Sequence, residues 1–150
     1  MMRLFVDAKY TKDKVYSAYV FLDDKNRVVK NGVLCNTKTS NKYIGYLYGL
    51  QKAMHEICRG DIAAEEFVIM CDSADILNWF EEGDLRVVPK SYRTLFTEIQ
   101  QSCVYSPVKL SIVKNYGTNY AKKYATVENY KSMEEEKIDG INVLDLFKDM

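Results

Sequence analysis

The chain has 150 residues, of which 47% are hydrophobic, and it carries 21 basic and 21 acidic side chains. This length favours one domain with its own core, and the apolar fraction excludes a chain that is disordered throughout. The apolar runs are too short to cross a membrane and no secretory signal pattern is present, so we expect a cytoplasmic protein with no membrane partner.

Charge is distributed unevenly along the chain. The first 127 residues carry 14 acids and 18 bases, whereas the remainder carries seven acids and three lysines. The body is therefore mildly basic and the C-terminal part acidic. A mild basic excess permits nucleic-acid binding but does not by itself indicate it.

The four cysteines do not form a metal-binding pattern. They lie at least 13 positions apart, and the chain has one histidine. A structural zinc site of the usual spacing is therefore not expected. We predict that the cysteines are reduced thiols in the core.

Three strands are predicted at the start of the chain. Residues 3–8 form a short apolar run, and residues 14–22 are rich in aromatic and β-branched side chains. A polar turn at 23–26 then leads into a third strand at 27–35. This part of the chain is predicted to be an antiparallel meander.

The rest of the chain alternates between helical spacing and short strand-like runs. The predicted elements are a helix at 41–58, a strand at 66–71, helices at 74–82 and 90–102, a strand at 108–113 and a helix at 118–130. A meander followed by helical crossovers indicates an α/β fold with a mixed sheet, in which later strands run parallel.

Two of the predicted strands end at an aspartate. Asp7 lies at the end of the first apolar run, and Asp72 directly follows the fourth. Buried strands rarely carry a charge that could be avoided, so we expect both carboxylates at one edge of the sheet. The stretches 35–55 and 104–127, where further acids would complete a metal site, contain neither Asp nor Glu.

Three segments, in this order, resemble the ribonuclease H-like superfamily over about residues 3–127. Phe5-Val6-Asp7-Ala8-Lys9 resembles its opening strand, Thr39-Ser40-Asn41 resembles its approach to the first long helix, and Met70-Cys71-Asp72-Ser73-Ala74-Asp75 resembles the turn after its fourth strand. The resemblance implies a mixed five-stranded sheet in the order 3-2-1-4-5, flanked by helices, for residues 1–130. Residues 131–150 would form an acidic tail or a docked helix.

The resemblance also implies an activity. Active members of the superfamily cut the RNA strand of an RNA–DNA hybrid, or related nucleic acids, with two magnesium ions held by four acids. Asp7 and Asp72 match two of these positions, but the acid of the first long helix falls near Ile44 or Tyr46, and the last acid near Lys122. Two carboxylates are too few to hold two divalent ions in the usual way, so the resemblance implies a degenerate metal site and no expected cofactor.

A cation could replace the metal between the two aspartates. Two nearby carboxylates repel each other, and an opposite charge within about 6 Å relieves this. A lysine stands where the resemblance implies the last acid, so we predict that Lys122, or else Lys123 or Lys9, is the counter-ion of Asp7 and Asp72.

The resemblance also suggests a nucleic-acid surface that includes the polar approach to the first long helix. The candidate binding residues are Lys9, Thr39, Ser40, Asn41, Lys42 and Lys122. Lysines and tyrosines alternate in the acid-free stretches and could hold phosphates and stack on bases. The simpler interpretation is a helix cap, solvated lysines and a tyrosine-rich core, and these stretches contain no arginine for specific recognition.

Three functions follow from these observations. The first is a pseudoenzyme: a domain that does not cut, and that binds an RNA–DNA hybrid, another nucleic acid, or a protein of a nucleic-acid machine. The second is an active nuclease that uses Mg²⁺ or Mn²⁺ with Asp7, Asp72, Asp75 and an acid of the tail, although an acid at position 75 also simply favours a helix start. The third is a protein–protein interaction module that keeps the fold and makes no use of the site. The segment 134–147 allows two arrangements, either folded back on the basic body or docked on a protein partner.

Overall fold

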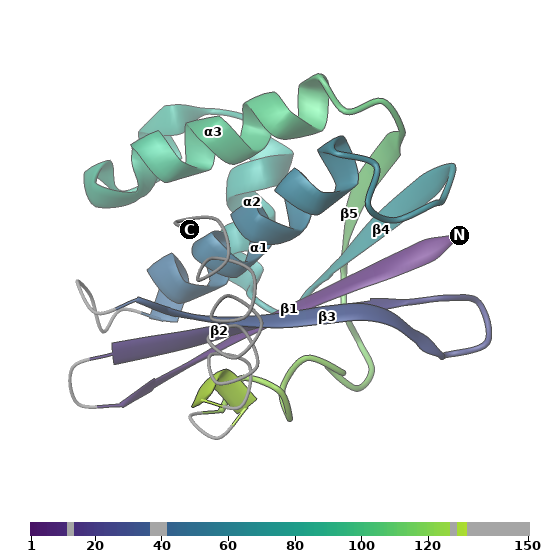
Figure 1. The fold of residues 1–150 in the computed structure, drawn as a ribbon. Coiled ribbons are helices and arrows are strands. Elements are labelled where there is room, and N and C mark those ends of the chain that lie inside the picture. The colour runs from purple at the N-terminus through teal and green to yellow at the C-terminus, as the bar shows by residue number, and fades with distance from the viewer. Residues whose placement is uncertain (12–13, 37–41, 127–128, 132–150) are drawn as a thin grey trace, which may run out of the picture.

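The centre of the molecule is a five-stranded sheet in the order β3-β2-β1-β4-β5 (Figure 1). The computed structural model describes residues 1–11, 14–36, 42–126 and 129–131. The strands are β1 (Met2–Thr11), β2 (Lys14–Leu22), β3 (Val28–Asn36), β4 (Glu66–Cys71) and β5 (Lys109–Lys114). The first three pair antiparallel, β4 pairs parallel with β1, and β5 pairs parallel with β4. The mixed sheet and its strand order are as predicted.

Three helices cover one face of this sheet (Figure 1). They are α1 (Lys42–Cys58), α2 (Ala74–Glu82) and α3 (Arg93–Val104). The sequence predicts that the third helix starts at residue 90, but residues 90–92 form a 3₁₀ turn because Pro89 holds an extended backbone before it. None of the helices in the described ranges is long and apolar enough to cross a membrane.

Two glycines of α1 let this helix lie close to the sheet. A Cβ atom added at Gly45 would lie 2.3 Å from the Cγ2 atom of Val15, and Gly49 has a similarly close neighbour on β1. The buried Ser17 hydroxyl donates a hydrogen bond of 2.6 Å to the Gly45 carbonyl. A larger side chain would push the helix away. The close approach brings the next residue, Tyr46, to the end of β1 and β4.

Each face of the sheet has its own core. Leu4 and Val6 of β1 pack under the helices, whereas Phe5 packs on the opposite face, as the two-residue period of a strand requires. Ala121 and Ala125, which follow β5 in the chain, cover that opposite face. Figure 1 shows this segment on the side of the sheet away from α1, α2 and α3.

The segment after β5 differs from the prediction. The sequence predicts a helix over 118–130, but the structure has turns over 120–124 and helical residues only at 129–131 among those described. The side-chain oxygen of Asn119 accepts a hydrogen bond of 2.9 Å from the Ala121 amide. Such a local side-chain bond competes with the helical hydrogen-bond ladder and favours a turn. The predicted acidic tail, beyond residue 131, lies outside the described residues.

All four cysteines are free, as predicted. Cys71 is buried at the end of β4, but Cys58 is exposed, so the prediction of core thiols is wrong for this residue. Cys58 is the last residue of α1. Its sulfur lies 3.9 Å from the Ser102 carbonyl of α3.

Candidate functional site

The parallel pairing of β1 with β4 brings the two predicted aspartates together. The register aligns Phe5 with Met70, so Asp7 and Asp72 follow at the same level, two residues further along. Both side chains line one cavity of about 470 Å³, called the site pocket below. Its lining residues are Val6, Asp7, Ala8, Tyr10, Tyr43, Tyr46, Asp72, Ser73, Ala74, Asp75 and Ile76.

Two amides hold the carboxylate of Asp72. The Nδ2 atom of Asn115 donates to Oδ1 of Asp72 at 2.8 Å, and the Nδ2 atom of Asn119 donates to Oδ2 at 2.6 Å. Asn119 also donates to the Val6 carbonyl of β1 at 3.1 Å. Both oxygens of Asp72 therefore have a neutral donor, and the same contacts join the ends of β1 and β4 to the segment after β5.

The backbone fixes the direction in which these amides point. The Oδ1 atom of Asn115 accepts from the Gly117 amide at 3.1 Å, and the Oδ1 atom of Asn119 accepts from the Ala121 amide at 2.9 Å. Because each side-chain oxygen is engaged by an N–H group, each NH₂ group must face Asp72. Neither amide oxygen is directed to the space beside Asp72 where a metal ion would need ligands, because both oxygens accept from backbone amides.

The phenol of Tyr46 enters the pocket from α1, at one of the two positions where the resemblance implies an acid. The side chain is 6% exposed, and its hydroxyl has no hydrogen-bond partner among the described residues. Burial raises the pKa of Tyr46 well above its usual value, with further contributions from the Cys71 thiol and from the charges of Asp72 and Asp7. The thiol of Cys71 itself donates to the Ser73 carbonyl, and its sulfur is only a weak acceptor. Tyr46 therefore stays protonated beside the two aspartates.

Asp75 completes the polar side of the pocket. It lies in the first turn of α2, where the Ser73 hydroxyl caps the helix by accepting from the Ile76 amide. The Tyr43 hydroxyl donates to Asp75 at 2.7 Å, and this hydrogen bond and the charge of Asp75 raise the pKa of Tyr43. The Tyr43 ring lies 5.8 Å from the Trp79 ring, so an aromatic wall adjoins the carboxylates.

These side chains do not fit a two-metal centre. Such a centre needs a dense set of carboxylates around ions that lie roughly 3.5–4 Å apart. Within the described ranges, no group of three or more His, Cys, Asp or Glu side chains is arranged to hold a metal ion. Asp72 is bound by amides, and a protonated phenol such as Tyr46 is a poor ligand for a hard cation.

The predicted counter-ions are exposed. Lys9 extends from β1, and Lys122 and Lys123 lie in the turns after β5. The ion pairs among the described residues include none between these lysines and Asp72, and Lys123 lies over the Tyr124 ring at 5.2 Å. Asp72 already has two neutral donors. A counter-ion role for Lys122 stays a prediction.

The remaining predicted binding residues lie at the start of α1. Thr39, Ser40 and Asn41 are outside the described residues, and Lys42 is described only as the first helical residue. Their role in nucleic-acid binding stays a prediction.

Sequence reasoning missed Asn115 and Asn119. The available signal was an Asx-turn pattern, in which an asparagine is followed two positions later by a residue whose amide it can bind. Asn115 comes directly after β5, the neighbour of β4 in the sheet. An amide in that position could have been expected at the same edge as Asp72.

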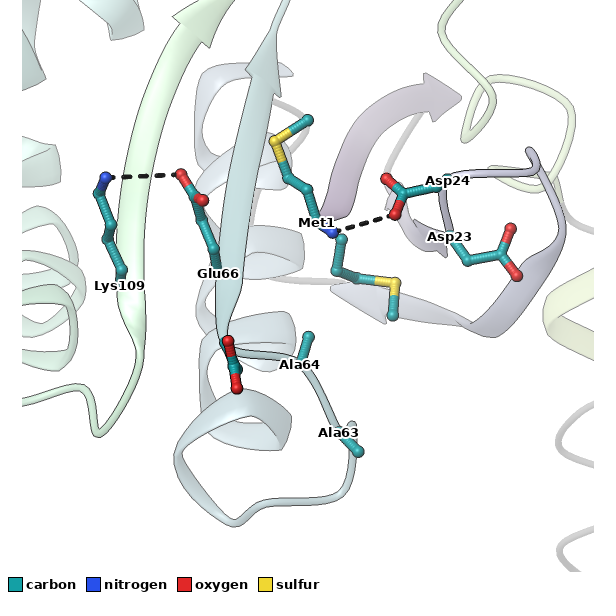
Figure 2. Close-up of a pocket in the computed structure, with 9 residues that line it drawn as sticks. Met1, Asp23, Asp24, Ala63, Ala64, Glu66 and Lys109 are labelled. Carbon is teal, nitrogen blue, oxygen red and sulfur yellow. Dashed lines mark hydrogen bonds and ion pairs between the residues drawn. The ribbon is translucent and has the colours of Figure 1, made fainter.

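A second cavity, called the opposite pocket below, lies where the parallel strands begin. It has a volume of about 520 Å³ and is lined by residues from the starts of β1, β4 and β5 and from the turn between β2 and β3. Figure 2 shows the amino group of Met1 beside Asp24 and Lys109 beside Glu66. Three of its four acids, Asp23, Asp24 and Glu66, have a cation partner, and it contains neither of the strand-end aspartates.

Comparison with known proteins identifies the fold. No protein-family model and no curated protein matches the sequence. The chain is similar to the solved structure of LC11-RNase H1, isolated from compost, in complex with an RNA/DNA hybrid; the TM-score is 0.72 at 13% identity, over 89% of this chain and 99% of that one. For RNase H1 of Halobacterium salinarum the TM-score is 0.70 at 12% identity, over 87% of this chain and 98% of that one.

A viral structure has the same fold. The protease-reverse transcriptase of prototype foamy virus matches with a TM-score of 0.65 at 13% identity, over 86% of this chain and 21% of that chain. These likenesses, together with the strand order, show that the chain has the ribonuclease H-like fold. At such low identity they show the fold alone.

Proposed function

We propose that this protein is a ribonuclease H-like domain that does not cleave nucleic acid and that serves as a binding component of a nucleic-acid machine. The observation that carries this proposal is the state of Asp72, whose two carboxylate oxygens each accept a hydrogen bond from an asparagine amide. Neutral donors stabilise the negative charge without a metal.

The environment of Tyr46 supports the same conclusion. A buried phenol lies beside Asp7 and Asp72, on the helix where the resemblance implies an acid. In a two-metal mechanism that acid would share the ions with the strand-end aspartates. A protonated hydroxyl adds no charge to bind an ion, so Asp7 and Asp72 are left as residual positions of a degenerate site.

A surface for nucleic acid is available beyond the pocket. Lys114 lies 5.3 Å from the exposed Tyr116 ring, and Lys122 and Lys123 are exposed in the turns that follow. Paired lysines and exposed rings can hold phosphates and stack on bases without sequence preference. Two similar structures were solved with an RNA/DNA hybrid and with double-stranded DNA, which supports such a partner here.

Cleavage and metal binding test the first half of the proposal. The protein should leave RNA–DNA hybrid, duplex and single-stranded substrates intact in millimolar Mg²⁺ or Mn²⁺, and these ions should not raise its melting temperature. The control is Asp7→Asn, which removes one of the two strand-end acids. Cleavage that disappears in Asp7→Asn would establish an active nuclease instead.

Salt dependence tests the second half. If the lysines contact phosphates, the affinity for hybrid should fall steeply as salt is raised. Replacing Lys114, Lys122 and Lys123 with glutamine should reduce both the affinity and this slope. Absence of salt-dependent binding would favour a protein–protein interaction module.

The active nuclease remains the second candidate because of one observation. Asp7, Asp72 and Asp75 all line the site pocket, although no group of three such side chains among the described residues is arranged to hold a metal ion. Its Mg²⁺ or Mn²⁺ would have to displace the amides from Asp72, and the thermal-shift experiment above detects that binding.

A further inference from the structure

We propose that Tyr116 and Lys114, at the end of β5, form a stacking site for an unpaired nucleotide, so that the protein prefers single-stranded nucleic acid to a duplex. This inference rests on the proposed nucleic-acid binding and names the class of strand that the surface holds. It is carried by the exposure of the Tyr116 ring, by the hydrogen bonds that fix the backbone around it, and by the ammonium group beside it.

The first observation is the exposure of the ring. Tyr116 is 88% exposed, more than any other large hydrophobic residue among those described. Its neighbours Lys114, Gly117 and Thr118 are exposed as well, so a flat ligand can reach the ring without disturbing the core. Single exposed apolar residues are common on protein surfaces, so exposure alone does not indicate a site.

The second observation is that the backbone on both sides of this ring is fixed. The Asn115 amide donates to the Cys71 carbonyl at 2.8 Å, which extends the pairing of β5 with β4. The Asn115 side chain accepts from the Gly117 amide at 3.1 Å and donates to Asp72 at 2.8 Å. A ring on a fixed backbone loses little conformational entropy when it binds, so Tyr116 is preorganised for contact with a ligand.

The third observation is the charge beside the ring. The Nζ atom of Lys114 lies 5.3 Å from the centroid of the Tyr116 ring, within the usual range of a cation–π contact. None of the ion pairs among the described residues includes Lys114, so its charge is available to a phosphate. A nucleotide joins a flat base to a phosphate through one sugar. A ring with an ammonium group beside it therefore matches both ends of a nucleotide.

Single strands fit this arrangement better than duplexes do. In a duplex, each internal base is paired and stacked between its neighbours, so its face is not available to a protein ring. An unpaired base can turn out of its strand and stack on an aromatic side chain, and such stacking depends little on sequence. The stretch 104–127 contains no arginine, the residue that most often reads guanine in a duplex, which agrees with stacking rather than with readout of base edges.

Fluorescence anisotropy tests the preference, in buffer without divalent ions so that all strands stay intact. The probes are a labelled mixed-sequence strand of about 12 nucleotides, as RNA and as DNA, and the hybrid and DNA duplex that contain the same strand. We expect at least one single strand to bind about tenfold more tightly than either duplex, as for one stacked base. The comparison of the RNA strand with the DNA strand shows which sugar the site accepts.

Two exposed tyrosines provide matched variants. Tyr116→Leu removes the ring and keeps apolar bulk, so it should weaken single-strand binding about tenfold and duplex binding by less than about twofold. Tyr116→Phe keeps the ring and should retain the affinity. Tyr105 is 82% exposed but precedes β5, at the other end of the strand, and Tyr105→Leu should leave all affinities unchanged. The melting temperature of each variant checks that it is folded.

A change at Lys114 tests the phosphate contact separately. Lys114→Gln should lower the slope of log affinity against log salt by about 0.7, the value for one phosphate contact with a single strand. The ring remains in this variant, so the preference for single strands should persist. An unchanged slope would show that Lys114 does not contact a phosphate and would overturn the two-part site.

The outcomes separate this inference from the proposed function. Equal affinity for single strands and duplexes would overturn the stacking site and leave nucleic-acid binding in place. So would single-strand binding that does not respond to Tyr116→Leu, or an equal loss of affinity in Tyr116→Leu and Tyr105→Leu. If no probe binds in a salt-dependent manner, the proposed nucleic-acid binding itself fails, and the stacking site fails with it.

Discussion

The two acidic pockets of this protein stabilise their carboxylates in different ways. In the opposite pocket, Asp24 lies 3.2 Å from the Met1 ammonium, and Glu66 lies 3.7 Å from the Lys109 ammonium (Figure 2). In the site pocket, Asp72 is held by two amides and Asp75 by a tyrosine hydroxyl. The cations offset the charges of Asp24 and Glu66, whereas the neutral donors orient Asp72 and Asp75 and leave their charge.

This difference affects how strongly each carboxylate can attract a further cation. A carboxylate that is paired with a lysine has little attraction left for a ligand, whereas one that is bound by amides keeps its charge and has a fixed position. Breaking either arrangement should therefore have different consequences.

The largest effect is expected from Asn119→Asp, which places an acid beside Asp72. The variant loses a hydrogen bond of 2.6 Å and places a second carboxylate in its position, so we expect the free energy of unfolding to fall by about 2–3 kcal/mol at neutral pH. Mg²⁺ should restore part of this loss by binding between the two acids. Urea denaturation with and without Mg²⁺ measures both effects.

Asn129→Asp is the matched control for that variant. The Asn129 amide donates to the carbonyl oxygens of Lys123 and Tyr124, not to a carboxylate. The control creates no carboxylate pair, so Mg²⁺ should not rescue it. The same Mg²⁺ rescue in both variants would contradict a specific pairing between Asn119 and Asp72.

Tyr46→Phe should have a smaller effect and of the opposite sign. It removes a buried hydroxyl whose neighbour, the Cys71 thiol, is only a weak acceptor, so the free energy of unfolding should rise by about 1 kcal/mol. Tyr19→Phe is the control, because its buried hydroxyl donates to Glu56 at 2.7 Å and its removal should destabilise. A loss of stability in Tyr46→Phe would show that the hydroxyl has a partner in solution.

Most of the fold was predictable from local patterns. Helical spacing located α1 and α2 almost to the residue, and the apolar runs located all five strands. The meeting of Asp7 and Asp72 was also predictable, because the C-terminal ends of neighbouring parallel strands lie at the same edge of the sheet. Each of these inferences uses residues that are close in the chain or a general rule of sheet geometry.

The chemistry of the site was less predictable because it depends on long-range contacts. Asn115 and Asn119 are 43 and 47 positions from Asp72, and their local Asx-turn pattern does not indicate which acid they bind. The helical spacing of apolar residues after 118 predicted a helix, but the turn at Asn119 replaced it. The sequence therefore predicted the meeting of the two aspartates but not the neutral groups that bind Asp72.

A pH titration compares the two pockets directly. In the site pocket, the hydrogen bond to Asp75 raises the pKa of Tyr43 above 10.0, so its stabilisation is present below pH 10 and is lost as the pH rises through the higher folded value. In the opposite pocket, hydrogen bonds lower the pKa of Asp23 below 3.8, and the bond from the Arg27 backbone amide makes the largest contribution. That stabilisation is present above this value and is lost as the pH falls through the lower folded value.

Asp75→Asn should therefore bring the pKa of Tyr43 back toward its usual value, while the pKa of Asp23 stays low. NMR titration of the tyrosine Cζ and the aspartate Cγ resonances measures both. Tyr43→Phe assigns the tyrosine signal. An unchanged tyrosine titration in Asp75→Asn would mean that the hydrogen bond of 2.7 Å does not persist in solution.

The smallest effect is expected from Asp24→Asn in the opposite pocket. The side chains of the two partners, Met1 and Asp24, are 48% and 73% exposed, and water screens such exposed ion pairs strongly. The free energy of unfolding should change by less than about 0.5 kcal/mol, and raising the salt should reduce even this difference. Urea denaturation at low and high salt provides the measurement. A loss of unfolding free energy comparable to that of Asn119→Asp would contradict this expectation. It would mean that the ion pair of Asp24 stabilises the protein as much as the amides at Asp72 do.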